Sequence, residues 1–184
     1  MPKQKQKKTT TDYSFLAIKI TGYHAAIDSS INYEVRDRHH HYPAAKVYSF
    51  GSRLELEGVC HYPAERDENN YAITVYGAER EADQFAMTLA DCQVYSEDRL
   101  PVYRKSRGKE VPVYDVPKGV GLLERERGTP NWHGWLWVPP QTVTDMLTLI
   151  PQVKPLYLAI QQLREGRKYW IVSLTLQTND PAVE

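Results

Sequence analysis

The chain of 184 residues is 41% hydrophobic, and its 23 basic side chains balance 23 acidic ones, so its formal net charge at pH 7 is zero. A domain of this length buries roughly 70% of the surface of its unfolded chain, so it needs no disulfide or metal to fold. The charge balance excludes a general attraction to polyanions or to an anionic membrane. No apolar run approaches the roughly 18 residues of a membrane span, and the two cysteines suit a reducing compartment. We therefore expect a soluble cytoplasmic protein with no membrane partner.

The two ends of the chain differ from its middle. Four lysines stand near the start with no acidic residue before Asp12, a composition typical of a disordered segment. We expect residues 1–12 to form this basic tail, residues 13–178 to form a single β-rich domain, and residues 179–184 to form a polar end.

Alternation of apolar and polar residues predicts the first strands. Residues 16–20 alternate and stop at Thr21 and Gly22, which indicates a half-buried strand. Residues 23–45 are irregular, apart from a possible charged edge strand at 32–38.

Two further strands follow the irregular region. Residues 54–60 place Leu54, Leu56, Gly58 and Cys60 on one face, so Cys60 is expected to point inward. Residues 71–76 place Tyr71, Ile73 and Val75 on one face.

The pattern weakens between residues 79 and 119. Residues 79–84 indicate a short surface helix, and residues 85–90 alternate as in a strand. Prolines and glycines among charged residues make 96–119 a loop or a protruding hairpin, with 111–113 as its returning strand.

The last third of the chain contains the clearest signals. Residues 122–123 and 132–138 are typical of two strands with a tight connection between them. Pro139 and Pro140 then open a helix, expected at 140–150, with one apolar stripe. Residues 155–177 predict a β-hairpin whose turn uses Gly166.

These elements predict a mainly β fold of about eight to ten short strands with one amphipathic helix, arranged as a β-sandwich or a barrel. Strands and helices do not alternate regularly, so a doubly wound parallel sheet is not expected. An α+β arrangement is the alternative.

Strand 132–138 holds three of the four tryptophans. One face would carry the candidate ligand-binding residues His133, Trp135 and Trp137, and the other would carry Trp132, Leu136 and Val138. Exposed rings in a row form a platform on which sugars, bases or a partner's side chains stack. Because both faces are apolar, the pattern favours the alternative of a central strand buried on both sides.

Histidines and cysteines offer a metal site only in part. Residues His39 to His41 and His61 have suitable side chains, but neighbours on an extended chain point to opposite sides. The same geometry argues against His61 as a base for Cys60. We expect no metal site, no cofactor and no catalytic residue.

A basic segment is the candidate nucleic-acid site. Arg104, Lys105, Arg107 and Lys109 follow Tyr103, so these cations could contact phosphates while the ring stacks on a base. Acidic residues interrupt the cations, however, and the pattern favours the alternative of a solvated loop.

The sequence therefore favours a noncatalytic binding or assembly module whose partner is an unidentified protein or small ligand. A nucleic-acid-binding β-barrel ranks second and an enzyme of unrecognised class ranks third, with the balance leaning against an enzyme. An exposed edge strand would allow a homo-oligomer.

Overall fold

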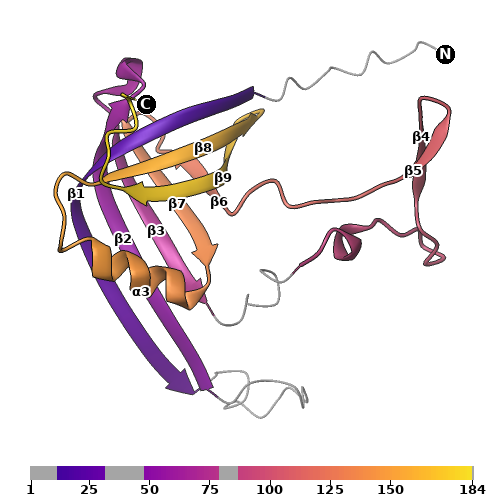
Figure 1. The fold of residues 1–184 in the computed structure, drawn as a ribbon, viewed down its shortest axis with the longest axis horizontal. Helices are drawn as coiled ribbons and strands as arrows, with labels where there is room; N and C mark the ends of the chain where they lie inside the picture. The colour runs from indigo at the N-terminus through magenta and orange to yellow at the C-terminus, as the bar shows by residue number, and fades with distance from the viewer. Residues whose placement is uncertain (1–11, 32–47, 79–86, 184) are drawn as a thin grey trace.

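Seven strands of the described chain form a closed barrel, and two more form a separate hairpin (Figure 1). The computed structural model describes residues 12–31, 48–78 and 87–183. Around the barrel the order is β1-β2-β3-β7-β6-β9-β8, and β8 pairs with β1 to close it. The elements are β1 (Asp12–Ile31), β2 (Tyr48–Tyr62), β3 (Asn70–Ala78), β4 (Tyr103–Ser106), β5 (Lys109–Pro112), β6 (Gly121–Arg125), β7 (Asn131–Val138), α3 (Pro140–Leu149), β8 (Tyr157–Glu165) and β9 (Lys168–Gln177), with 3-10 turns at Ala64–Arg66 and Ala90–Cys92. The predicted mainly β fold is confirmed, with one α-helix in the described residues, and the sheet is a barrel, not a sandwich.

The first strand is much longer than the sequence pattern indicates. β1 spans 20 residues and continues past Gly22, where the alternation stops. A register shift between Ile20 and Gly22 in the pairing with β2 absorbs the irregularity, as a β-bulge does. β1 pairs with β8 from Asp12 to Lys19 and with β2 from Ala17 to Ile31. The glycine marks a bulge within the strand and not its end.

The interior of the barrel is filled by the side chains predicted to point inward. From β2 and β3 these are Leu54, Leu56, Cys60, Tyr71, Ile73 and Val75, all of which are buried. One pair of strands departs from the antiparallel pattern, since β3 and β7 run parallel. This pairing brings residues about sixty positions apart in the chain side by side.

Helix α3 adds its apolar stripe to the same core. It begins at Pro140, as predicted. Proline lacks a backbone N–H, and in the first turn of a helix that N–H would have no intrahelical acceptor. Val143 and Met146 are buried in the barrel core. The helix lies so close to Gly77 that a Cβ there would be 2.9 Å from Val143 Cγ2.

The predicted C-terminal hairpin is confirmed as β8 and β9. Gly166 has a φ of 63° in the turn between them, a conformation that glycine adopts without strain. Ser14 accepts a hydrogen bond of 2.9 Å from the fully buried Gln162, which links β8 to β1.

The strand predicted at 85–90 is absent from its described part, residues 87–90. Asp91 accepts hydrogen bonds of 2.7 Å from the backbone N–H and the hydroxyl of Thr88, and this side-chain contact closes a turn. The possible strand at 32–38 and the short helix at 79–84 lie outside the described residues, as do residues 1–11 of the predicted tail. None of the described helices is long and apolar enough to cross a membrane.

Candidate functional site: an aromatic and acidic outer face

Strand β7 lies in the barrel wall between β3 and β6, and its residues alternate between the two sides of that wall. The inward residues are Trp132, Gly134 and Leu136, and the outward residues are His133, Trp135 and Trp137. The predicted division of the faces is confirmed. The favoured alternative, with both rows of rings in the core, is wrong, because Trp137 is 39% exposed and His133 is exposed as well.

The outward side chains of β7 stay accessible because the hydrophobic core lies inside the closed barrel. A closed sheet has one interior, and the single described α-helix joins that interior instead of covering the outside of β7. Trp135 is half-buried, whereas His133 and Trp137 are exposed, so the row presents accessible ring surface.

Strand β3 contributes a second outward row beside the first. The parallel register places Thr74 opposite Trp135 and Tyr76 opposite Trp137. The rings of Tyr76 and Trp137 stack with centroids 6.0 Å apart and planes inclined by 23°. Two adjacent strands therefore share one aromatic surface.

Strand β2 adds carboxylates to this surface. Its register places Glu55 opposite Thr74 and Glu57 opposite Ala72. Both carboxylates line a hollow of about 320 Å³ that also touches His133 and Trp135. We call this surface the aromatic face and define it by seven residues. They are Glu55, Glu57, Thr74, Tyr76, His133, Trp135 and Trp137.

The aromatic face is acidic overall. Arg53 forms an ion pair of 3.3 Å with Glu55, and both side chains are more than 40% exposed. On the neighbouring strand β6, Glu124 lies opposite His133 and is exposed. Among the described residues no cation pairs with Glu57 or Glu124. The face thus presents carboxylates that can accept hydrogen bonds from a ligand, next to rings that can stack.

Glu55, Glu57 and Tyr76 were not predicted as parts of this site. Their alternation with the buried residues of β2 and β3 did indicate an outward orientation. It did not indicate which strand would lie beside β7, because the parallel pairing of β3 with β7 has no local sequence signal.

Inside the wall, Trp132 forms the centre of an aromatic cluster. Tyr71 stacks on it at 6.0 Å and Tyr169 meets it edge-on at 5.2 Å. The guanidinium of Arg66 lies 5.8 Å from the ring centroid. This inward side of β7 packs the core, in contrast to the outward side.

Cys60, close to this cluster, is held as a thiol. Burial raises its pKa, and the opposing effect of the Arg66 charge is smaller. The thiol donates a hydrogen bond of 3.6 Å to the carbonyl of Pro63. A thiolate nucleophile is therefore disfavoured at this position.

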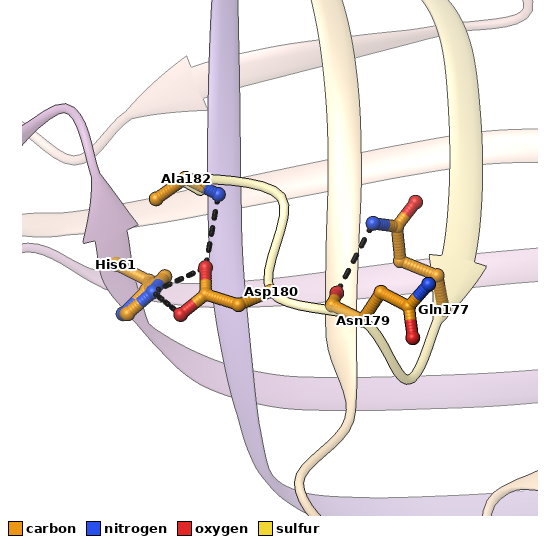
Figure 2. A network of polar contacts seen from close by, with 5 residues as sticks. All are labelled: His61, Gln177, Asn179, Asp180 and Ala182. Atoms are coloured by element: carbon orange, nitrogen blue, oxygen red, sulfur yellow. Dashed lines mark hydrogen bonds and ion pairs between the residues drawn. The ribbon is translucent and has the colours of Figure 1, made fainter. Parts of the chain in front are cut away.

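His61 contacts the C-terminal segment through Asp180 (Figure 2). Its Nε2 lies 2.8 Å from both carboxylate oxygens of Asp180. The other histidines considered as ligands, 39–41, lie outside the described residues. Within the described part of the chain no three metal-binding side chains gather.

Asp180 anchors the predicted polar end, residues 179–184, to the barrel. A hydrogen bond of 2.9 Å from the backbone N–H of Ala182 and the contact with His61 hold the pKa of the Asp180 carboxyl below its usual value. Since the folded pKa is the lower one, the carboxylate adds stability above the unfolded pKa, and this is lost as pH falls through the folded pKa.

We predict that Asp180→Asn lowers the urea midpoint of unfolding at neutral pH because it removes this carboxylate. The difference from the unaltered protein should shrink as pH falls through the acid range, where Asp180 itself becomes protonated. Urea titrations across that range measure it. Asp115→Asn is the control, because the Asp115 side chain is exposed. A difference that stays constant down to the acid limit contradicts the prediction.

The basic residues of the candidate nucleic-acid site lie on the β4–β5 hairpin. Arg104, Lys105, Arg107 and Lys109 are all exposed there, together with Tyr103. Figure 1 draws this hairpin apart from the barrel. The hairpin and the aromatic face are therefore two separate surfaces within one chain.

The pairing of β1 determines where a strand edge is free for the predicted homo-oligomer contact. Pairing of β1 with β8 closes the barrel and removes the edges there. Beyond Ile20 the described partner of β1 is β2 alone.

Comparison of the chain with protein-family models, with curated protein sequences and with solved structures found no match. Any function must therefore be argued from the chemistry of the aromatic face and the hairpin.

Proposed function

We propose that this chain is a noncatalytic binding module and that the aromatic face is its ligand surface. One observation carries the proposal. A barrel whose core is complete without them nevertheless holds Trp135, Trp137 and Tyr76 side by side on its outside, on the neighbouring strands β7 and β3. Trp137 is exposed, and Trp135 and Tyr76 are half-buried. Apolar ring surface in contact with water costs free energy, and aromatic rings are enriched at surfaces that bind partners.

The charges of the face favour a protein segment as the ligand. Glu57 and Glu124 have no cationic partner among the described residues, and they would repel a phosphate backbone. An arginine or lysine can pair with a carboxylate and stack on a ring at the same time. A segment rich in basic and aromatic side chains therefore fits both properties of the face.

An enzymatic reading of the same hollow is weaker. His133, Glu55 and Glu57 line it together, which is a combination used in acid and base catalysis. Yet all three side chains are in contact with solvent, and among the described residues His133 makes no hydrogen bond to either carboxylate. Catalytic groups usually need the desolvation that a deeper site provides.

A cytoplasmic location belongs to the same proposal. Cys60 and Cys92 are both free thiols, which fits a reducing compartment.

The binding test uses the full chain and short synthetic peptides. A peptide of alternating tyrosine and arginine should bind and change the tryptophan fluorescence, whereas a peptide of alternating tyrosine and glutamate should not. Replacing Trp135 and Trp137 together with alanine should weaken binding at least about tenfold, as loss of two interface rings typically does. The variant should remain folded by circular dichroism.

Tyr13→Ala is the matched control, because Tyr13 is an exposed ring on β1 and is 59% accessible. It should bind the basic peptide as the unaltered chain does. Equal affinity for both peptides, or unchanged affinity after loss of the two tryptophans, contradicts the proposed function.

A further inference from the structure

Residues 87–116, which we call the arm, form an ordered segment without a core. None of its side chains is buried. Seven of the sixteen exposed large apolar side chains of the described chain belong to it, far more than its share of the length. They are Met87, Leu89, Tyr95, Leu100, Tyr103, Tyr114 and Val116. Such a concentration on one small segment marks an interaction surface.

Backbone hydrogen bonds give the arm its shape. Val94, Val102 and Val113 bond to one another in a closed set of three, at 2.8 to 2.9 Å. Asp115 donates its N–H to the carbonyl of Cys92 at 2.8 Å. The arm is thus held by its main chain, and its apolar side chains stay available to a partner.

The tip of the arm is a tight and strongly basic hairpin. Arg107 and Gly108 have φ values of 50° and 79°, the two positive values that a two-residue turn of this kind requires. Arg104, Lys105, Arg107 and Lys109 outnumber the single acidic residue of strands β4 and β5, Glu110. Their spacing along the two strands is fixed by the pairing of β4 with β5.

The hairpin complements the aromatic face in both charge and chemistry. The whole chain has no net charge, yet it separates a basic and tyrosine-bearing hairpin from an acidic and tryptophan-bearing face. Tyr103 and Lys105 repeat every second residue on β4, as Trp135 and Trp137 do on β7. Strands share one rise per residue, so the two repeats match in length.

We propose that the hairpin of one copy of this chain binds the aromatic face of a second copy. This inference rests on the proposed function and names the partner of that same face. Tyr103 of the hairpin stacks with Trp137, and Lys105, on the same side of β4, pairs with Glu55 or Glu57. Arg104 and Lys109 extend from the other side of the hairpin and add to its positive charge. Within one chain the hairpin lies apart from the barrel (Figure 1), so the contact is made between copies.

Charge reversal tests the contact in both directions. One variant carries Arg104→Glu, Lys105→Glu and Lys109→Glu, so that its hairpin and its face are both acidic. Another carries Glu55→Lys and Glu57→Lys, so that its hairpin and its face are both basic. The unaltered chain should associate at about 100 µM, since interfaces of moderate size have dissociation constants in the micromolar range. Each variant should sediment as a monomer at that concentration, because its hairpin and its face repel each other. High salt should weaken association of the unaltered chain.

Restored association is the decisive result. An equimolar mixture of the two variants pairs the acidic hairpin of one with the basic face of the other, so it should associate again. A chain with all five reversals should also associate with itself. Circular dichroism of each variant checks that the fold is intact. Tyr103→Ser, which keeps every charge, should weaken association as well.

Three results would overturn the inference. The first is a monomeric unaltered chain under these conditions. The second is loss of association in both variants without recovery in the mixture. The third is salt-sensitive binding of oligonucleotides that the acidic-hairpin variant loses. If the tyrosine and arginine peptide still binds the aromatic face in any of these cases, the proposed function stands and only its partner is wrong.

Discussion

Replacing Trp132 with alanine should lower the free energy of unfolding by about 3–5 kcal/mol, the range seen for buried large aromatic side chains. Trp132 is only 6% exposed, and the rings of Tyr71 and Tyr169 contact it from two directions. Removal of the indole leaves a cavity between β3, β7 and the start of β9. The neighbouring rings cannot close this cavity unless their backbones move. Denaturant titration followed by circular dichroism measures the loss.

Trp137→Ala provides the matched control on the other side of the same strand. Trp137 is 39% exposed, so its removal opens no cavity, and a cost of less than about 1 kcal/mol is expected for the lost stacking on Tyr76. Trp132→Phe should lie between the two, since it keeps much of the bulk and removes an indole N–H that has no hydrogen-bond partner among the described residues. Equal losses for Trp132→Ala and Trp137→Ala would show that both sides of β7 are core.

Replacing Gly77 with alanine should cost about 1–3 kcal/mol, the usual penalty for overpacking. Gly77 lies where β3 meets helix α3. An added Cβ would collide with Ser52 Oγ and would lie 2.9 Å from Val143 Cγ2 and 3.0 Å from Pro140 Cα. The helix has to move away from the barrel, and thermal unfolding should report the change.

A second substitution separates the two sources of this strain. Ser52→Gly removes the nearest atom, so the double variant with Gly77→Ala should regain part of the stability. Recovery should remain incomplete, because Pro140 contributes backbone that cannot rotate away. Gly108→Ala tests a different property of glycine. No atom of the described residues lies within 4 Å of its Cβ position, so its φ of 79° is what opposes a side chain there. A loss for Gly77→Ala no larger than a few tenths of a kcal/mol contradicts the close approach of α3.

Local patterns predicted those parts of the fold that depend on local physics. The alternation in 54–60 and 71–76 identified the inward side chains, because a strand turns successive residues to opposite sides. Pro139 and Pro140 marked the start of α3, and Gly166 marked the turn between β8 and β9. The prediction failed at Gly22, where a β-bulge carries the strand onward, and at 87–90, where Asp91 closes a turn.

The candidate site was predicted only in part, for the same physical reason. His133, Trp135 and Trp137 were assigned correctly to one side of their strand, since that depends on alternation alone. Whether this side would face water depends on what packs against it, and the apolar character of both sides favoured the wrong alternative. The carboxylates of β2 were not predicted as part of the site, because no local sequence pattern around Glu55 indicates that it lies near Trp135.

What the amino-acid sequence determined by itself is therefore a β-rich chain with one helix, an inward and an outward side for most strands, and a basic segment at 104–109. Only the tertiary structure decided that the sheet closes through β1 and β8, which leaves the outer side of β7 open. It also decided that β3 lies parallel to β7, which brings Tyr76, Glu55 and Trp135 onto one surface. Closure and strand order are set by contacts between residues far apart in the chain, and such contacts leave no periodic signal in any one segment.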